Sequence, residues 1–554
     1  MGGASGALIN KTARASTPDE VLNRYIFFCG FVLSAAGGLH GFNNSNMSGI
    51  MKASCGMHAF KESFKFAQYS ATALADIQGW VTSSIVIGGL IGALIAAPIT
   101  DRFGRKKTLY ACGLLYTIGC IVQIVTSTNI NQQIGGRALQ GFGGGIASVC
   151  GTAYLAEIAP KAIRGLLGSL FGTNTMFGIA AGYWSNYIAI LHISDNSPWQ
   201  WRLALIVQMI PGAMILFLLP LVPESPRWLA VQGRTDEALA VLVKLRKLPA
   251  EHDFVVQEFS DIVGGVEQER AAGKASWIGA FRELWSDNTM MRRFIVVMLI
   301  QIGYNFSGGN SITYYQTTIL NSVGIQGNDA YLFSGIYGLI KVLALFVYAI
   351  YCTEHFGRRK TLLIGGSLDM LCVMWIAIYL GALEGNKPGG WVSVAALCLF
   401  ALGYGISWAP NSYNVSAEVF PNQVRAKFTS LAMGLQYLVN FLIVRYFPNM
   451  SANITPKGPF IMFACVSAAI LLFMFFALPE VKGVAIEHIA PLFSSPLLAN
   501  GLRSSRLNRS ARDREAADAA TVTDGKTKGE VRHIEDGKDE MEKGSESGAA
   551  TPRV

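Results

Sequence analysis

Charge is scarce in this chain of 554 residues. Only 15% of the residues are charged, and most of them lie in short loops, one central segment and the two tails. A soluble chain of this length would fold as several domains, with charge spread along each of them. The sequence therefore excludes an ordinary soluble multidomain protein.

Cysteine is also sparse, at nine residues. Eight of them lie within or at the ends of apolar runs, where cysteine behaves as a small hydrophobic residue. Cys55 lies outside these runs and has no partner there. The sequence therefore predicts no disulfide framework.

Several functional motifs are absent. The chain has no Gly-x-x-x-x-Gly-Lys-Ser/Thr sequence, which argues against a nucleotide-driven pump. Nothing in it resembles a metal-ligand cluster or a nucleophile triad, so we expect no enzymatic activity, no metal site and no cofactor. The net charge of +9 comes without interleaved basic and aromatic residues, and we expect no nucleic-acid partner.

Long apolar runs dominate instead. About half of the residues are hydrophobic, and glycine, at 59 residues, suits closely packed membrane helices. A run of about 20 residues is long enough to cross the bilayer as a helix. Twelve runs of that kind lie at 25–44, 79–100, 107–127, 136–156, 165–190, 203–222, 293–320, 330–352, 361–382, 391–413, 428–447 and 458–478. They predict an all-α membrane protein with twelve transmembrane helices.

The chain is internally duplicated. Asp101 to Lys107 and Glu354 to Lys360 are nearly the same loop, and each joins two apolar runs. Downstream of them, Glu157 to Arg164 and Glu418 to Arg425 share Glu, Pro and Arg at identical spacing. We therefore expect two six-helix halves with a central site between them. The expected parts are an N-terminal tail (1–24), a first half (25–222), a connector (223–292), a second half (293–480) and a disordered C-terminal tail (481–554).

The positions of lysine and arginine predict the orientation. The loops after the second, fourth, eighth and tenth runs are basic, and the opposite loops have few such residues. Cytoplasmic loops carry this excess, so both termini are expected in the cytoplasm. We expect a multi-pass protein of the plasma membrane that functions as a monomer.

Several short motifs in this sequence, taken together and in order, are specific for one family of membrane proteins. The chain resembles the sugar porters of the major facilitator superfamily, and Ser334 to Lys341 is most similar to fungal members, including the quinate permease group. The resemblance implies a carrier that moves a sugar or related polyol by alternating access, as a facilitator or a proton symporter. A quinate or sugar-acid permease and a non-transporting nutrient sensor remain alternatives. The matching marks are Gly136-Arg137, Gly141, Gly143, Tyr154, Glu157, Pro160, Arg164-Gly165, Pro223 to Arg227, Asn310, Tyr314-Tyr315, Glu418 to Lys427 and Pro479 to Gly483.

Charged residues at the cytoplasmic helix ends form one candidate set. The resemblance implies that they make ion pairs which hold the inner gate shut while the site faces outward. They would also serve simply as markers of topology. The set is Asp101, Arg105, Glu157, Arg164, Glu224, Arg227, Glu354, Arg358, Glu418 and Arg425.

Polar residues inside apolar runs form the candidate substrate site. Neutral amides can bind hydroxyl groups, and an aromatic ring can pack on the C–H face of a polyol. Each of these residues also suits a helix-to-helix hydrogen bond, worth about 0.6 kcal/mol on average. The candidates are Asn174, Tyr304, Asn305, Asn310, Tyr314, Tyr315, Asn411, Tyr413, Asn414, Gln436, Tyr437 and Asn440.

Several hexose contacts of the family are missing. The glutamines typical of hexose carriers fall on Gly172, Tyr304 and Asn305, and a tryptophan falls on Tyr413. Losing a buried hydrogen-bonding partner is expensive for the substrate that used it. We therefore expect a pentose, a larger glycoside, or a cyclic polyol or acid in place of glucose.

Energy coupling is the last open point. In proton-linked members of the family the first run ends in Gly-aromatic-Asp, and that carboxylate faces the arginine that here is Arg137. This chain has Asn43 instead, which cannot carry a proton. We expect facilitated diffusion, or a coupling site elsewhere that includes Lys341, because a charged residue inside an apolar run is a functional candidate. Lys341 would also suit a substrate carboxylate or a structural contact to a neighbouring helix.

Overall fold

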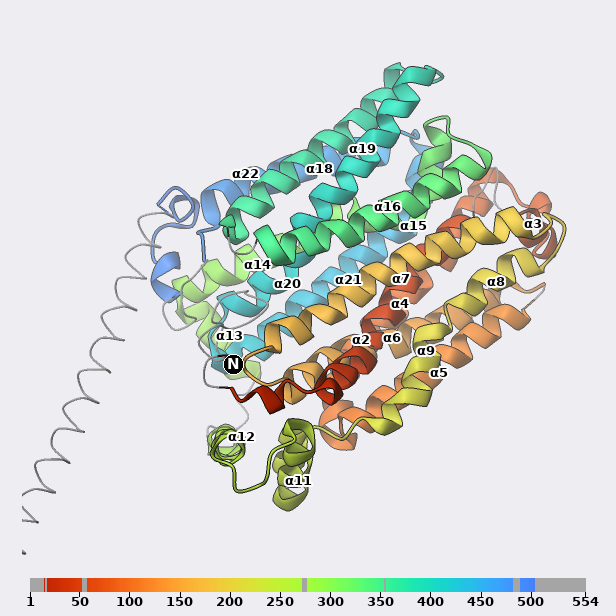
Figure 1. Cartoon of the computed structure of the whole chain (residues 1–554). Helices are drawn as coiled ribbons and strands as arrows, with labels where there is room; N and C mark the ends of the chain where they lie inside the picture. Colours follow the sequence, from red (N-terminus) through yellow and green to blue (C-terminus); the bar gives the residue numbers. More distant parts are fainter. Residues whose placement is uncertain are drawn as a thin grey trace, which may run out of the picture.

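The first half of the chain forms a six-helix bundle. The computed structural model describes Arg14 and residues 17–51, 57–126, 128–271, 277–352, 355–481 and 489–503. The six passes of the first half, coloured red to yellow in Figure 1, are α2 (Arg24–Ile50), α4 (Ala71–Phe103), α5 (Arg105–Val125), α6 (Ile130–Ile158), α7 (Arg164–His192), and α8 (Trp199–Val207) with α9 (Ile210–Leu218).

The second half repeats this pattern and packs beside the first. Its six passes, coloured green to blue, are α14 (Asn288–Phe306) with α15 (Gly309–Ser322), α16 (Gly327–Val347) with the π turn Tyr348–Cys352, α18 (Gly357–Ala382), α19 (Lys387–Ile406) with α20 (Trp408–Val419), α21 (Asn422–Asn453), and α22 (Gly458–Ala477). The predicted fold of twelve transmembrane helices in two halves is confirmed. Several helices are longer than the predicted runs, and α2 and α4 extend into residues 45–78, between the first two runs.

Nine passes among the described residues are long and apolar enough to cross a membrane by length and composition alone. The passes that fall short are α6, α7 and the broken pair α14–α15. These three carry many polar and glycine residues, among them Arg137, Asn174 and Asn310. Hydropathy is therefore lowest in helices that carry candidate site residues.

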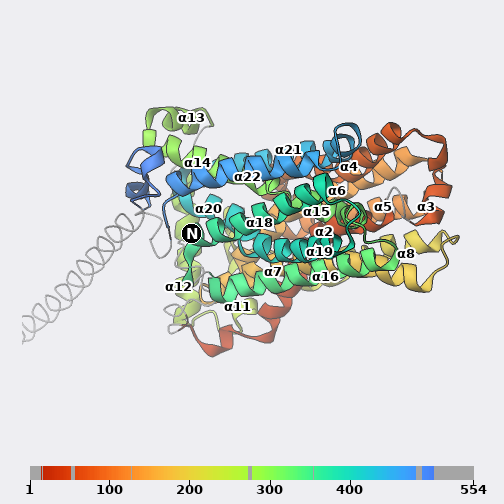
Figure 2. The same ribbon diagram turned by 90° about the horizontal axis from the view of Figure 1, so that it is seen from above.

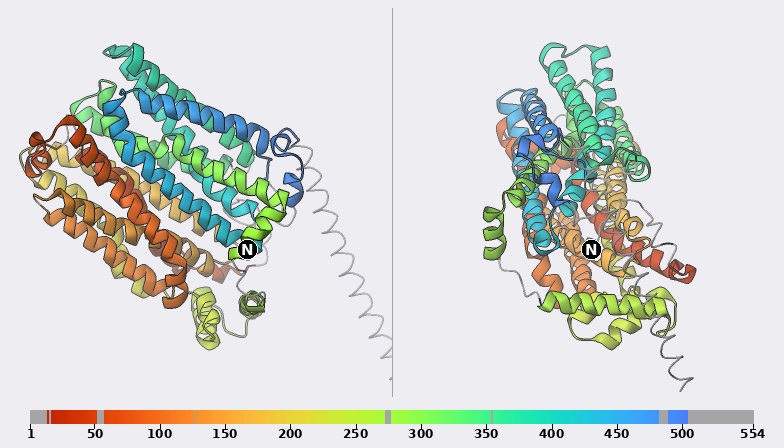
Figure 3. Two further views of the ribbon diagram at one scale, coloured as in Figure 1. Left: turned by 180° about the vertical axis from the view of Figure 1, so that it is seen from behind. Right: turned by 90° about the vertical axis from the view of Figure 1, so that its left-hand side faces the viewer.

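The two ends of the bundle differ. One end, here named the basic end, carries the loops around Arg102–Lys107 and Arg358–Lys360, together with the connector helices α10 (Pro226–Val231), α11 (Thr235–Arg246), α12 (Asp253–Ala271) and α13 (Trp277–Ser286). The start of the described chain lies at the same end in Figures 1 and 2, and α12 lies across it in Figure 3. The other end, named the α3 end, carries the short helix α3 (His58–Ser63).

The repeated loops between the second and third passes are stabilised by the same contacts in both halves. Gly104 and Gly357 have φ of 92° and 80°, in the region that favours glycine. A Cβ at Gly104 would lie 2.6 Å from Glu224 Oε2, and one at Gly357 would lie 2.7 Å from the Glu480 carboxylate. Each glutamate accepts hydrogen bonds from the first backbone N–H groups of the next helix, α5 or α18. A carboxylate is stabilised there by the helix dipole.

Two passes of the second half are interrupted. Helix α14 ends at Phe306, and Gly308, with φ of 89°, leads into α15. Helix α19 ends at Ile406, and Ser407, with φ of −115° and ψ of −88°, leads into α20. The Ser407 carbonyl accepts two hydrogen bonds from Asn411, one from its backbone N–H at 3.2 Å and one from its side chain at 2.8 Å.

Candidate functional site

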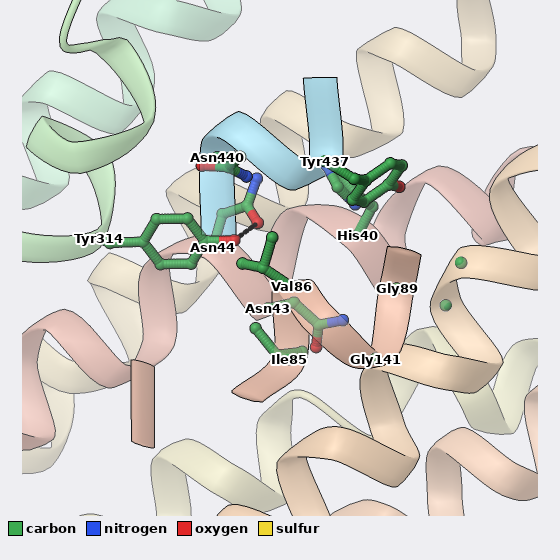
Figure 4. Close-up of a pocket in the computed structure, with 12 residues that line it drawn as sticks. His40, Asn43, Asn44, Ile85, Val86, Gly89, Gly141, Tyr314, Tyr437 and Asn440 are labelled. Atoms are coloured by element: carbon green, nitrogen blue, oxygen red, sulfur yellow. Dashed lines mark hydrogen bonds between the residues drawn. The ribbon is translucent and has the colours of Figure 1, made fainter. Parts of the chain in front are cut away.

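A cavity lies between the two halves. It encloses about 290 Å³ of space not filled by atoms, which includes space open to solvent. Helices α2, α4 and α6 line it from the first half, and α15 and α21 from the second. Figure 4 shows the side chains, which are His40, Asn43, Asn44, Ile85, Val86, Tyr314, Tyr437 and Asn440, and the wall includes Gly89, Gly141, Gly144 and Gly145.

The polar groups of this cavity are only partly satisfied. The Tyr314 hydroxyl donates to Asn44 Oδ1 at 2.7 Å, across the two halves. Asn43 Oδ1 and Asn440 Oδ1 are buried and have no hydrogen-bond partner within the described part of the chain. Buried amide oxygens normally find a partner, so these two are ready acceptors for a hydroxylated ligand.

A second polar cluster of the C-terminal half joins α14, α15, α19, α20 and α21. Asn310 donates to Asn305 Oδ1 at 3.1 Å and accepts from the hydroxyls of Tyr304 and Tyr404 at 3.4 and 3.5 Å. Asn305 also donates to the carbonyl of Gln436 at 3.0 Å, four residues before Asn440. The cluster thereby reaches the helix that lines the cavity.

An aromatic residue extends this cluster. Gln436 Nε2 donates to the Tyr413 hydroxyl at 3.3 Å, and the rings of Tyr304 and Tyr413 meet edge to face. Tyr413 is 47% exposed although it lies within a membrane pass. The structure thus brings Tyr304, Asn305, Asn310, Tyr413 and Gln436 together, as the sequence suggested.

Other predicted substrate residues make contacts elsewhere. Asn411 and Asn414 bond to Tyr348 of the π turn, and Asn411 also bonds to Thr361 of α18. Asn174 donates to Ser34 Oγ within the first half at 2.6 Å. Tyr315 donates to the carbonyl of Val444 and stacks on Phe447. These hydrogen bonds join helices, and the four residues are absent from the cavity lining.

The halves are joined toward the α3 end. Besides Tyr314 and Asn44, hydrogen bonds link Ser48 to Thr317, Tyr331 to the Gly49 carbonyl, and Tyr183 to the Thr313 carbonyl. Arg445 of α21 forms an ion pair with Asp76 of α4. This end of the cavity is closed.

At the basic end, the strongest ion pairs stay within one half. Arg105 binds both oxygens of Glu157 at 3.0 and 3.1 Å and also pairs with Asp101. Arg358 binds both oxygens of Glu418 at 2.8 and 3.2 Å. The same pair therefore recurs at the repeated position of each half, with the bidentate geometry that fixes a guanidinium firmly.

The remaining predicted gate residues differ in their contacts. Arg164 and Arg425 donate to the carbonyls of Ala159 and Phe420 in their own halves. Glu224 binds the backbone of α5, as described above, and Arg227 lies in α10. Glu354 lies outside the described residues.

The predicted coupling residues are buried. Arg137 of α6 donates through Nε to the Val81 carbonyl at 2.7 Å, and its two terminal nitrogens have no partner among the described residues. It lies one helical turn from Gly141, which lines the cavity. Lys341 lies on α16 and donates to Thr313 Oγ1.

The sequence interpretation missed several residues. His40 and Asn44 line the cavity, and both are polar residues in the first apolar run, so a scan of that run would have found them. Glu480 follows a proline just as Glu224 does, so the duplication pointed to it. Asp369, buried in α18, is an acidic residue in an apolar run that the search for polar side chains overlooked.

Comparison with known protein sequences gives consistent relatives. A family model described as sugar (and other) transporter matches residues 29–493. A probable quinate permease of Aspergillus niger is 29% identical over 530 residues, which cover 94% of this chain and 97% of the relative. The quinate permease of Emericella nidulans is 29% identical, covering 90% of this chain and 94% of the relative.

Solved structures share the fold. An inward open conformation of the xylose transporter XylE from E. coli matches with a TM-score of 0.69 and 24% identity, covering 84% of this chain and 98% of that one. The proton:xylose symporter XylE bound to 6-bromo-6-deoxy-D-glucose matches with a TM-score of 0.68 and 23% identity, covering 85% and 99%. At this level of identity the likeness establishes the twelve-helix architecture.

Proposed function

Because the chain belongs to the sugar (and other) transporter family and is a multi-pass membrane carrier, we propose that its substrate is a polyhydroxylated ring that bears a carboxylate, of the quinate type. The observation that carries this proposal is the cavity between the halves. Its wall combines neutral amide and phenol groups with His40, and Arg137 lies one helical turn away. No enzymatic activity, metal or cofactor is part of the proposal.

The cavity chemistry supports both parts of such a substrate. Asn43 and Asn440 offer buried carbonyl oxygens to ring hydroxyls. Arg137 offers two guanidinium nitrogens that have no acceptor within the described chain, and these would suit a carboxylate.

The relatives named as quinate permeases favour the same substrate. A neutral monosaccharide or polyol is the second candidate, because the groups that line the cavity are mostly uncharged. The two candidates differ in one respect, which is whether the positive charge of Arg137 contributes to binding.

Transport follows alternating access about this cavity. The excess of basic residues supports a cytoplasmic location for the basic end and both termini. The proposal takes the carrier to be a monomer of the plasma membrane. The joined α3 end then corresponds to a closed outer gate and an inward-facing state. In the outward-facing state, Arg164 and Arg425 would exchange partners with the acidic residues Glu157 and Glu418 across the halves, which closes the inner gate.

Uptake and competition measurements test the substrate. The full chain is expressed in a host that lacks its own carriers, and uptake of labelled quinate is measured against competing quinate, its neutral carboxamide, galacturonate, glucose and xylose. We expect the carboxamide to compete at least tenfold more weakly than quinate, because a charge-assisted hydrogen bond contributes about 1.5–3 kcal/mol. Equal competition by the carboxamide, or preference for glucose or xylose, would favour the neutral candidate. Absence of uptake for every compound would contradict the carrier proposal and favour a nutrient sensor.

A further inference from the structure

Two opposite charges are buried inside the second half. Lys341 of α16 is 2% exposed and Asp369 of α18 is 1% exposed. Both are described, and no ion pair within 4.0 Å joins them or pairs either one with another described residue. A charged group in a membrane interior is expensive unless it is paired or neutralised. Structure alone does not require either side chain, so a function must be sought for both.

The ammonium of Lys341 contacts both interrupted passes, α14–α15 and α19–α20. It lies 4.8 Å from the ring centre of Tyr337 and 4.9 Å from that of Tyr404, and it donates to Thr313 Oγ1 on α15. The carbonyl of the same Thr313 accepts from Tyr183 of the first half, at the closed end of the cavity. Thr313 therefore connects Lys341 to the hydrogen bond from Tyr183 that joins the two halves.

The carboxylate of Asp369 contacts the pass formed by α19 and α20. Oδ2 lies 3.5 Å from the hydroxyl of Ser407, at the break between α19 and α20, and the same hydroxyl donates more closely to the Gly403 carbonyl at 2.7 Å. Oδ1 is buried and has no partner in the described chain. A Cβ built on Gly403 would lie 2.3 Å from this oxygen, so the carboxylate lies directly against the backbone of α19 one turn before the break.

The segment between the two charges belongs to α19. Tyr404, whose ring lies beside Lys341, directly follows Gly403 in the chain, and its hydroxyl donates to Asn310 of the cluster that reaches the cavity helix. A change in the angle at Ser407 would move Gly403 and Tyr404 together. Lys341 and Asp369 would therefore both respond to this movement, because they contact adjacent residues of the same helix.

We propose that Asp369 and Lys341 together form the site that binds and releases the proton coupled to transport, in place of the carboxylate that Asn43 lacks. Asp369 takes up one proton and becomes a neutral acid in one facing state, and it returns to the carboxylate and loses that proton in the other. Lys341 stabilises the ionised form, and the break at Ser407 links the two states to the cavity. The inference rests on the carrier function proposed above and adds its energy source.

Other titratable groups near this site are few. Helix α22, which also packs on α18, faces it with Leu471 near Gly366. Ser407 supplies a hydroxyl from the break before α20. The titratable neighbours are Lys341 and Tyr337 of α16, Tyr404 and Cys398 of α19, and Cys372 of α18 itself. Asp369 is the only carboxylate among these groups of the described chain, and the proposal therefore assigns the exchanged proton to it.

Transport by the purified full chain in proteoliposomes tests the coupling, with labelled quinate as the probe. Wild type should accumulate quinate when the outside is one pH unit more acidic, up to about tenfold for one proton, and a protonophore should abolish this. Asp369→Asn should lose accumulation and approach a ratio of one, while it keeps substrate exchange across the membrane. Lys341→Met should also lose accumulation, and Asp369→Glu should restore part of it. The exposed residues Asp329 and Lys387 supply the matched controls Asp329→Asn and Lys387→Met, which should behave as wild type.

The outcomes separate this inference from the proposed function. Protonophore-sensitive accumulation that survives in Asp369→Asn overturns it, and so does wild-type exchange without any accumulation, although the carrier function then stands. Proton binding is also measured without substrate, by infrared difference spectra of the purified protein between about pH 5 and pH 8. A protonated-carboxyl band that is present in wild type and absent in Asp369→Asn supports the inference even if quinate is not the substrate. Identical spectra in the two proteins overturn it.

Discussion

The side chain of Asn440 lines the cavity with a carbonyl oxygen that has no partner among the described residues. We predict that Asn440→Ala raises the KM for quinate about fivefold, because one neutral hydrogen bond contributes about 1 kcal/mol. Initial uptake rates over a range of substrate concentrations measure the change. Asn414→Ala is the control, since Asn414 bonds to Tyr348 outside the cavity lining and should affect KM less. An unchanged KM in Asn440→Ala would remove this amide from the substrate site.

The choice of residues shows what a sequence alone can predict about such a site. Polar residues in apolar runs were good candidates, and Asn440, Tyr314 and Tyr437 do line the cavity. Asn411 and Asn414 satisfied the same criterion, yet they bond to helices of their own half. The hydropathy of a run predicts that a residue lies in a helix. The rotation of that helix about its own axis, relative to its neighbours, determines whether the side chain faces the cavity. That rotation depends on packing and cannot be derived from composition.

The N-terminus of α18 is stabilised by Glu480, which lies more than a hundred residues later in the sequence, just after the last helix of the same half. Its carboxylate accepts from the backbone of Arg358 and Arg359 at 3.0 and 3.1 Å. We predict that Glu480→Ala lowers the free energy of unfolding by about 1–2 kcal/mol, because two N–H groups lose their acceptor and the helix dipole loses its anion. Thermal melting of the purified protein in detergent measures the loss. Glu384→Ala, at an exposed loop position, should leave the melting temperature unchanged, and equal melting of both variants would contradict the capping role.

The helices themselves were predicted well, whereas their interruptions were not. Twelve runs of about 20 apolar residues gave the twelve passes because the bilayer demands that length. The breaks at Ser307–Gly308 and at Ser407 involve only one or two residues each, inside runs that otherwise continue as helix. Glycine and serine are common in membrane helices, so neither residue type marks a break by itself. Only the backbone angles at Ser407 and the side-chain hydrogen bond from Asn411 to the Ser407 carbonyl reveal the second break.

The balance between the two facing states depends on contacts such as the ion pair between Asp76 and Arg445. Asp76 is half exposed, so its pairing contributes at most about 1 kcal/mol. We predict that Asp76→Asn shifts the population toward the outward-facing state by up to about fivefold, because the pair exists only when the α3 end is closed. Labelling of a cysteine introduced at Ser48 by an impermeant reagent added outside should increase accordingly. Asp329→Asn is the control, and unchanged labelling in Asp76→Asn would contradict the role of the pair.

The two capping glutamates, Glu224 and Glu480, also bear on how the molecule is made. Each follows the last pass of its half and locks the loop between the second and third passes of that same half. During synthesis, the first half can therefore complete its own loop before any of the second half has left the ribosome. We predict that two separately expressed fragments, 1–274 and 275–554, assemble in the membrane and recover quinate uptake, and that Glu224→Ala reduces the yield of the first fragment more than that of the second. Each half would then act as its own unit of membrane insertion, and the capping contact of its glutamate would form only when the last helix of that half is in place.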